Sequence, residues 1–257
     1  MRLATWNVNS LNARIDRVTE WLELLHPDVV CLQETKLADE DFPHDVFGDL
    51  GYESTHHGQG QWNGVAVLSR LGLEDVHHDF GDGGEPDRDA RILWATCGGV
   101  RVASCYVPNG RSLDDPHYEY KLDWLDRLSN DLADNHDPSD QVCVVGDFNI
   151  APDDRDVYDA DTHEGATHVS AAERDRLAEL AAWGLHDVFR DHHDEAGLYS
   201  WWDYRDGNFH KRKGMRIDLI LATEPVRTAT TRVFVDRNAR KGKLPSDHAP
   251  VVADIAT

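Results

Sequence analysis

Long hydrophobic runs and lysine are scarce in this chain. The longest apolar runs have the length of a strand, which excludes a transmembrane helix of about 20 residues. Residues 1–7 read as a strand from the start, without the apolar region of a signal peptide, so we expect a soluble, cytoplasmic protein. Pro/Ser-rich linkers, internal repeats and low-complexity tracts are also lacking. We therefore expect residues 1–257 to form a single domain.

The chain has few cysteines, and none of them forms a C-x-x-C pair. Each of the four lies in an apolar stretch, which favours buried thiols that act as small hydrophobic groups over a disulfide or a zinc site. Reduced core cysteines fit the cytoplasm. They are Cys31, Cys97, Cys105 and Cys143.

The scarcity of lysine leaves a formal net charge of -22, which at first argues against a nucleic-acid partner, because polyanion binding normally needs a basic surface. The few lysines are not spread evenly, however. Four of the six lysines, Lys211, Lys213, Lys241 and Lys243, lie between residues 205 and 243, and the arginines near them include Arg205, Arg212, Arg216, Arg237 and Arg240. This clustering predicts a local basic strip on an acidic body, with solvated loop charges as the alternative. The acidic, lysine-poor composition also suggests a host with high internal salt.

Short strand patterns alternate loosely with helical ones, which predicts a mixed α/β fold. Apolar spacings of three and four predict helices around 15–25, 118–132 and 171–182, and Asp114-Asp115 before Pro116 is a helix start. The expected strands are 2–8, 28–32, 64–68, 92–96, 101–107, 142–145, 217–222 and 251–255.

Two short polar segments directly adjoin apolar strands: Gly-Asp-Phe-Asn at 146–149 and Ser-Asp-His at 246–248. A strand edge is a rigid platform that can hold side chains at fixed geometry. In extended geometry Asp147 and Asn149 would face the same side and converge on one phosphate, the acid acting on water and the amide holding it. An Asx turn that only satisfies local backbone is the alternative, and the segment alone leaves the two about even.

A second acid, Asp218, lies inside the apolar strand Met-Arg-Ile-Asp-Leu-Ile-Leu. A buried charge needs a partner, and His248 is the natural one, since a carboxylate on one ring nitrogen orients the imidazole and favours its charged form. A purely structural Asp–His pair is the alternative. Glu34, with Asn7 beside it, follows a buried run and is the first choice for a Mg²⁺ ligand, and Asp247 would add another.

Strand-end and aromatic residues complete the candidates. Tyr106 ends a strand and could donate to phosphate, and the turn after it presents Asn109 and Arg111. The aromatic cluster at 199–204 beside the basic strip offers stacking faces for bases or a slot for a base-free sugar, with ordinary core as the alternative.

Taken in order, these segments resemble the exonuclease III family of abasic-site endonucleases, within the endonuclease/exonuclease/phosphatase superfamily. The matching segments are TWNVNSL, LQETK, YVPNG, GDFNIAP, WWDYR, MRIDLIL and PSDHAPV, and they span the whole chain. The resemblance implies a four-layer α/β sandwich of two mixed sheets with helices outside, and Mg²⁺ or Mn²⁺ as cofactor. It also implies cleavage of duplex DNA on the 5′ side of abasic sites, 3′→5′ exonuclease activity and removal of 3′ phosphates. We expect the protein to be a monomer.

The resemblance also implies residue roles. Glu34 is the main metal ligand, with Asn7, Asp247, Asp147 and Asn149 near it. Asp147 would activate water, Asn149 position it, Tyr106 and His248 contact the phosphate, and Asp218 orient His248. The group that takes the proton stays open among His248, Asp147 and a metal-bound hydroxide. The expected DNA contacts, with Trp201, Met215 and Ile217 lining the sugar pocket, are Asn109, Arg111, Trp201, Trp202, Arg205, Lys211, Met215, Arg216, Ile217, Lys241 and Lys243.

Some relatives carry a carboxylate at the position of Asn9 and an aromatic residue at that of Met215, which bears on second-metal binding and on abasic selectivity. Two alternatives remain. Another enzyme of the superfamily, acting on inositol phosphates, sphingomyelin or generic DNA, would share the Asp-x-Asn and Ser-Asp-His elements, but the WWDYR and MRIDLIL segments favour the repair branch. A non-catalytic module that binds damaged DNA would be expected to have lost a catalytic group, and none is lost here.

Overall fold

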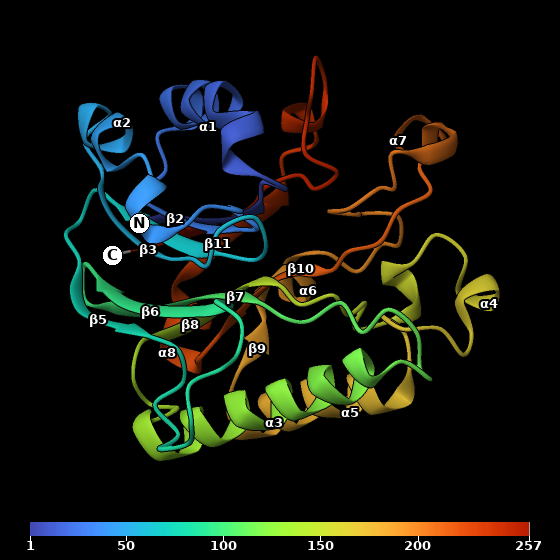
Figure 1. Ribbon diagram of the computed structural model, residues 1–257. Helices are drawn as coiled ribbons and strands as arrows, with labels where there is room; N and C mark the ends of the chain where they lie inside the picture. The colour runs from blue at the N-terminus through green and yellow to red at the C-terminus, as the bar shows by residue number, and fades with distance from the viewer. Residues whose placement is uncertain (257) are drawn as a thin grey trace.

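Two six-stranded mixed sheets pack face to face in the computed structural model, which describes residues 1–256 (Figure 1). The first sheet has the order β11-β12-β1-β2-β4-β3, with strands Thr230–Val235, Val251–Ile255, Arg2–Asn7, Val29–Gln33, Val65–Ser69 and Glu53–His57. The second has the order β5-β6-β7-β8-β10-β9, with strands Glu74–His78, Ile92–Cys97, Val100–Tyr106, Val142–Asp147, Asp218–Ala222 and His186–Asp187.

Helices cover the outer face of each sheet (Figure 1). α1 (Leu11–Leu25) and α2 (His44–Asp49) lie over the first sheet, and α3 (Pro116–Asn135) and α5 (Ala171–Trp183) lie over the second. The fold class predicted from the resemblance, a four-layer α/β sandwich, is confirmed. The shorter helices are α4 (Ala160–His163), α6 (Val188–His192), α7 (Asn208–Lys211) and α8 (Glu224–Ala229), with 3₁₀ turns at Asp39–Asp41, Asp154–Asp156, Arg205–Gly207 and Arg237–Arg240.

The central strands carry apolar side chains on both faces, and this arrangement produces three layers of core. Leu3, Val67 and Val145 belong to the cluster between the sheets. Trp6 lies in the cluster under α1 and α2, and Trp124 lies in the cluster under α3 and α5. Strands buried on both faces read as continuous apolar runs instead of alternating ones, which is why the central strands were visible in the sequence.

The expectation of buried, unpaired cysteines is confirmed, since all four are free and buried. Cys31, Cys97 and Cys143 lie between the sheets and Cys105 lies under α3 and α5. Burial raises the pKa of the Cys97 thiol to about 11 and that of Cys143 to about 12. These thiols are therefore protonated and packed as small hydrophobic groups.

The strands that the sequence pattern missed are β3, β5, β9 and β11, and each of them is an edge of its sheet. β5 is exposed at every residue and β3 reads Glu-Ser-Thr-His-His, so neither has an apolar run. An edge strand is buried less than a central one and is blunted with polar residues. The predicted strands are all present, with ends shifted by one or two residues.

The helix start predicted at Asp114-Asp115 is confirmed, because the Asp115 side chain accepts from the backbone N–H of His117 at 2.8 Å and Pro116 opens α3. Helix α5 begins with a capping box between Ser170 and Glu173. Among residues 1–256, no helix combines the length and the apolar character needed to cross a bilayer.

Candidate active site

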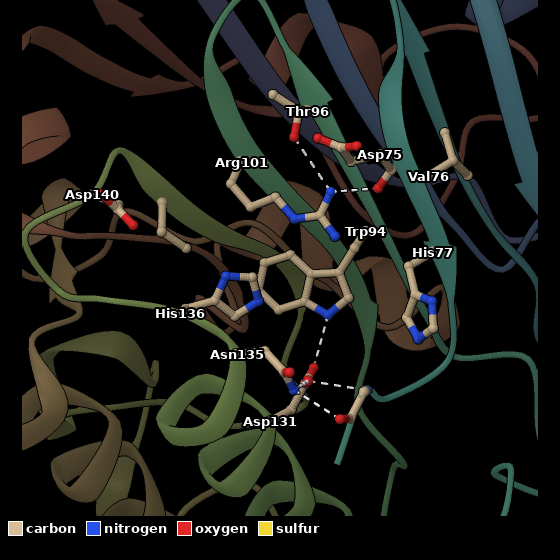
Figure 2. A pocket seen from close by; sticks show the side chains of 12 residues that line it. Asp75, Val76, His77, Trp94, Thr96, Arg101, Asp131, Asn135, His136 and Asp140 are labelled. Carbon is tan, nitrogen blue, oxygen red and sulfur yellow. Dashed lines mark hydrogen bonds between the residues drawn. The ribbon is translucent and has the colours of Figure 1, made fainter. Parts of the chain in front are cut away.

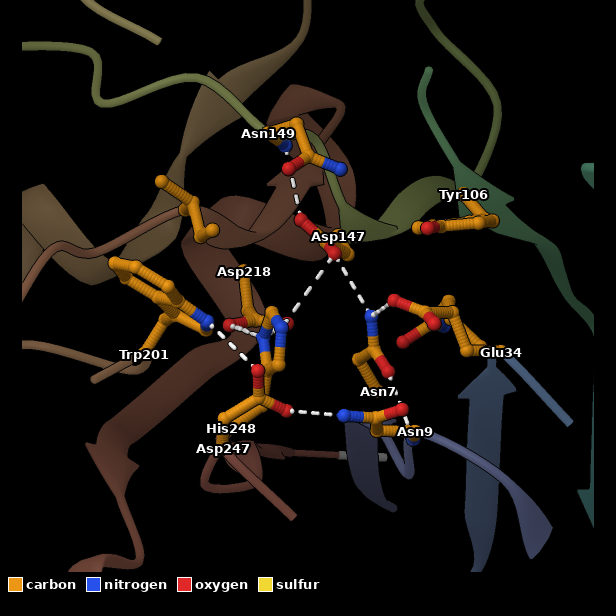
Figure 3. Close-up of polar contacts among 12 residues, drawn as sticks. Asn7, Asn9, Glu34, Tyr106, Asp147, Asn149, Trp201, Asp218, Asp247 and His248 are labelled. Atoms are coloured by element: carbon orange, nitrogen blue, oxygen red, sulfur yellow. Dashed lines mark hydrogen bonds and ion pairs between the residues drawn. The ribbon is translucent and has the colours of Figure 1, made fainter. Parts of the chain in front are cut away.

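Strand register places three of the predicted site residues side by side. In the second sheet Tyr106 pairs with Asp147 across the parallel strands β7 and β8, and Asp147 pairs with Asp218 across the antiparallel strands β8 and β10. In the facing sheet β1 ends at Asn7, and Glu34 directly follows β2. Figure 3 shows the two sets of side chains pointing toward one another at this edge of the sandwich.

The backbone at this edge is unusual. A Cβ on Gly146 would lie 1.9 Å from the carbonyl oxygen of Cys105, so only glycine lets β8 approach β7 just before Asp147. Glu34 and Asn149 have φ values of 51° and 52°. Non-glycine residues in this left-handed region are uncommon and gather at functional positions.

The side chain of Asn7 links the two carboxylates of the site. Its Nδ2 donates to Glu34 Oε1 and to Asp147 Oδ2, both at 2.8 Å. Its Oδ1 accepts from the backbone N–H of Asn9 at 2.9 Å and is thus turned away. Asn7, expected among the metal ligands, here holds the two carboxylates together and offers them a donor.

Asp147 and Asn149 form the Asx turn that was the alternative reading of their segment. The Asn149 N–H donates to Asp147 Oδ1 at 2.9 Å. The left-handed φ of Asn149 makes the expectation of extended geometry wrong. The turn nevertheless leaves Asp147 Oδ2 facing Asn7 and His248, so a local turn and a functional carboxylate coexist.

His248 is held by Asp218 and faces Asp147. Its Nδ1 lies 2.8 Å from Asp218 Oδ2, and its Nε2 lies 3.7 Å from Asp147 Oδ2 (Figure 3). Burial lowers the pKa of His248, but the negative charges of Asp218 and Asp147 and the bond to Asp218 outweigh it and raise the pKa to about 10. The imidazole is therefore a cation at neutral pH, and both ring nitrogens donate.

The pKa values of Asp147 and Tyr106 are both raised by burial and by nearby carboxylates. Burial raises the pKa of Asp147 to about 7; the Asp218 and Glu34 charges add to this, and the His248 charge opposes it. Burial and the Glu34 charge raise the pKa of Tyr106 well above its usual value. Asp147 can thus exchange a proton near neutral pH, whereas Tyr106 stays a neutral donor.

The donor set fits a hard divalent cation. Glu34, Asp147 and His248 have potential ligand atoms within 4.8 Å of one another. Because His248 is a cation, the two carboxylates are the donors that suit Mg²⁺ or Mn²⁺, which prefer oxygen. Lys36 Nζ already lies 2.8 Å from Glu34 Oε2, on one side of that carboxylate.

Asp247, predicted as a further ligand, lies outside this cluster. Its Oδ1 accepts from Asn9 Nδ2 at 2.9 Å and its Oδ2 accepts from Trp201 Nε1 at 3.1 Å. Lys36 Nζ donates to Asn9 Oδ1 at 2.7 Å. Asp247 is therefore part of a hydrogen-bonded chain that connects the first strand end to the Trp201 segment.

The predicted sugar-pocket residues come together beside the site. Met215 and Ile217 pack with Ala151 and Val157 in a small apolar cluster, against which the partly buried Trp201 lies. Backbone bridges join Trp201 to Met215 and to His248. These three residues thus form one apolar wall next to the imidazole.

Two of the predicted DNA contacts are corrected, because their side chains lie in the interior. Trp202 is 1% exposed and Arg216 is fully buried. Arg216 forms ion pairs with Asp156 at 2.6 Å and with Asp187 at 2.7 Å. A phosphate cannot reach either residue, and the basic strip that the sequence predicted is therefore partly internal.

Apart from the sugar-pocket residues Trp201, Met215 and Ile217, the remaining predicted DNA contacts are exposed. Asn109 and Arg111 lie on the rim, and Asn109 Nδ2 donates to Asn149 Oδ1 at 3.0 Å. Arg205 is neutralised within its own turn by Asp203 at 2.6 Å. The lysines among these predicted contacts are Lys211 at the end of α7, and Lys241 and Lys243 in the loop before the Ser-Asp-His segment.

The sequence reading missed a groove that opens directly from Tyr106. This Trp62 groove has a volume of about 500 Å³ and is lined by Gln59, Trp62, Asn63, Arg88, Asp89, Arg91, Tyr106, Asn109, Arg111 and His117. Trp62 is 64% exposed, which is unusual for so large an apolar side chain. The isolated tryptophan in Gln-Gly-Gln-Trp-Asn-Gly was the only signal available in the sequence.

A second cavity lies at the opposite end of the same strands, and its polar groups satisfy one another (Figure 2). Arg101, near the start of β7, donates to the Asp75 carbonyl at 2.6 Å. Trp94 donates to Asp131 at 2.9 Å, and His136 stacks on Trp94 with ring centroids 4.4 Å apart. We therefore assign the chemistry to the Tyr106 end.

A four-layer sandwich with carboxylates, an amide and an imidazole gathered at one sheet edge defines a hydrolase of phosphate esters. The chain belongs to the endonuclease/exonuclease/phosphatase family, whose model matches residues 4–248. Within it the chain belongs to the exonuclease III group, as the resemblance predicted. Exodeoxyribonuclease III of Haemophilus influenzae is 33% identical over 266 residues, which cover 99% of each chain.

Solved structures agree with this placement. An AP endonuclease from Archaeoglobus fulgidus is 34% identical with a TM-score of 0.97. A 3′ phosphatase from Neisseria, bound to a product DNA hairpin, is 38% identical with a TM-score of 0.96. Each comparison covers 100% of both chains.

Proposed function

We propose that the protein is a DNA repair nuclease that hydrolyses the phosphodiester on the 5′ side of abasic sites in duplex DNA, using Mg²⁺ or Mn²⁺. The same site would remove nucleotides and phosphates from 3′ ends. The observation that carries the proposal is the register that aligns Tyr106, Asp147 and Asp218, with cationic His248 between the two acids. The relatives named as an exonuclease, an AP endonuclease and a 3′ phosphatase support all three activities.

The cation would be held mainly by Glu34, with Asp147 beside it. When bound, it would supply Lewis-acid stabilisation of the negative charge on the phosphate. The raised pKa of Asp147 reflects burial and the nearby carboxylates, and a positive charge would offset both causes. The buried carboxylates of the site therefore favour the binding of a cation.

His248 and Tyr106 would bind the phosphate. The imidazolium can donate from Nε2 to a non-bridging oxygen because Asp218 occupies Nδ1. The neutral phenol of Tyr106 can donate to another oxygen, and the Arg91 guanidinium lies 4.7 Å from the centre of its ring and fixes it from behind. Donors prepared in advance for developing negative charge are a large source of catalysis.

Asp147 would take the proton from the attacking water. His248 already carries its proton, because the charges of Asp218 and Asp147 raise its pKa to about 10, so the Asp147 carboxylate is the acceptor that remains. Asn149 lies next to it and keeps a free lone pair on Oδ1 that can accept from the same water. Asp147 and Asn149 would therefore activate the water. His248 and Tyr106 would bind the phosphate.

A nuclease assay tests the proposal directly. A duplex with one tetrahydrofuran abasic analogue and a duplex with a 3′ phosphate are incubated with the protein and Mg²⁺ at several salt concentrations. We expect incision 5′ to the analogue and release of phosphate from the second duplex. No product from either duplex at any salt concentration would refute the proposed function.

The lysines of the loop before Ser246 are expected to bind DNA phosphates. Replacing Lys241 and Lys243 with Gln should weaken duplex binding and lower the slope of log Kd against log salt by about 2, because each lost phosphate contact contributes about 0.9. Arg232→Gln, on edge strand β11 near the far end of the sheet, is the control and should leave the slope unchanged. Unaltered affinity in the lysine variant would show that these charges are only solvated.

The Trp62 groove is expected to hold the part of the DNA strand that extends away from the scissile phosphate. Trp62→Ala should weaken binding of the abasic duplex by about 10-fold or more, since stacking of a base on an aromatic ring contributes about 1–3 kcal/mol. Trp62→Phe should retain most of the affinity. The single-turnover rate at saturating protein should change little, and a large loss of rate with unchanged affinity would contradict this assignment.

A further inference from the structure

A buried ion pair lies directly behind the site and has no part in the mechanism above. Lys121 of α3 and Glu173 of α5 are both fully buried and form an ion pair. Lys121 Nζ also donates to the carbonyl oxygen of Asn149 at 2.7 Å and to that of Asn109 at 3.4 Å. The ammonium group therefore touches the backbone of two site residues.

Glu173 extends this contact to a third segment. Its Oε1 accepts from Thr167 Oγ1 and from the His168 N–H, both at 2.9 Å. Its Oε2 accepts from Ser170 Oγ at 2.6 Å. Thr167 Oγ1 also lies 3.0 Å from the Asn109 carbonyl oxygen, so its single proton is shared between that oxygen and Glu173 Oε1. The pair thus joins the loops at 107–111, 147–151 and 165–170.

The loop that contains Asn149 needs such support. Asn149 is in the left-handed region, its N–H is held by Asp147, and its carbonyl is held by Lys121 and by the ring of His168. Its side chain is fixed by Asn109 and by the Val107 carbonyl, each at 3.0 Å. Both peptide groups of Asn149 are therefore constrained. Lys121 donates to the carbonyls of both Asn149 and Asn109.

Stability alone does not account for this pair. Taking two charges out of water is costly, and well-packed apolar residues in place of a buried ion pair are often neutral or stabilising. An apolar pair could fill the space between α3 and α5, but it could not donate to the Asn149 and Asn109 carbonyls. The ammonium group therefore contributes directed hydrogen bonds that an apolar side chain cannot replace.

We propose that Lys121 and Glu173 are positioning residues for catalysis, which hold Asn149, and through it the water-binding half of the site, in the reactive geometry. They do not touch the substrate. The proposal rests on the function proposed above and deepens it, because it assigns a role in the chemical step to two residues outside the site. Misplacement of a reacting group by about 1 Å can cost about 100-fold in rate.

The test removes both charges together, since a single change would leave one buried charge unpaired. In the Lys121→Met/Glu173→Gln variant we expect a fall of about 10- to 100-fold in the single-turnover rate of incision, with little change in duplex affinity. In an Asn149→Ala background the same two replacements should have little further effect, because residues that act through one another are not additive. Equal losses in both backgrounds would overturn the proposal.

A second ion pair, partly exposed and remote from the site, provides the control. Arg2 and Asp254 pair at 2.7 Å near the start of β1, at the end remote from Asn7. The Arg2→Met/Asp254→Asn variant should lose thermal stability and keep its rate. A loss of rate that follows the loss of Tm in both variants would reduce the Lys121–Glu173 pair to a structural role.

Hydrogen exchange gives a readout that does not depend on activity. Amide exchange in residues 148–151 should be faster in the Lys121→Met/Glu173→Gln variant and unchanged in the control. If that variant does not fold, Lys121→Gln/Glu173→Gln, which also removes both charges together, is measured in the same way. A wild-type protein that cuts no DNA would refute the proposed function, whereas unchanged exchange at 148–151 would refute the positioning role.

Discussion

Asp147→Asn should lower the single-turnover rate of incision by about 10³- to 10⁴-fold, because it removes the group that takes the proton from water. Asn has the same shape, so the Asx turn with Asn149 should survive. The change also removes one of the two carboxylates that suit the cation. The affinity for an abasic duplex, measured by fluorescence anisotropy, should largely remain.

Asp131→Asn is the matched control for this variant. Asp131 is also buried and accepts from Trp94, Gly81 and Asn135, but it lies in the cavity at the opposite end of the strands. Its replacement should lower the free energy of unfolding and leave the rate intact. If Asp147→Asn reduced binding as much as cleavage, Asp147 would be a structural residue.

His248→Asn should lower the incision rate by about 10³-fold, since it removes a preformed donor to the charge that develops on the phosphate. It also leaves the fully buried Asp218 without its partner, so the variant should unfold at a lower temperature. Single-turnover kinetics and thermal unfolding measure the two effects separately.

Adding Asp218→Asn to His248→Asn provides the internal check. Because Asp218 acts on the phosphate only through the imidazole, the double variant should lose little more rate than His248→Asn alone, and it should regain stability. A further large loss of rate would mean that Asp218 has a role of its own. An Asp218→Asn variant with full activity would show that the pair is structural.

The fold was largely readable from the sequence where burial is complete. Central strands such as β2 and β8 are continuous apolar runs because helices and the opposing sheet cover both faces. The edge strands β3 and β5 carry polar residues for reasons of solubility, and they pair with β4 and β6 without an apolar run of their own. Local pattern therefore could not reveal them.

The candidate residues that the structure brings together stand out in the sequence as polar groups at the ends of buried strands, but their contacts were not predictable. The orientation of Asn7 depends on Asp147, which lies 140 residues away. The burial of Arg216 depends on Asp156 and Asp187. A cluster of positive residues in sequence therefore does not distinguish a surface that binds phosphate from an internal ion pair. Lys121 gave no local signal, because its partner is on another helix.

The central claim is a cation-dependent hydrolysis at the edge shared by Glu34, Asp147 and His248. Its most direct measurement is the cleavage of a duplex with one tetrahydrofuran abasic analogue, with Mg²⁺ and with excess chelator, followed by analysis of the new ends. We predict a 3′-hydroxyl on the 5′ side of the analogue with Mg²⁺ and no product with chelator, at unchanged protein fold. Equal incision with and without chelator, or cleavage only on the 3′ side of the analogue, would contradict the account.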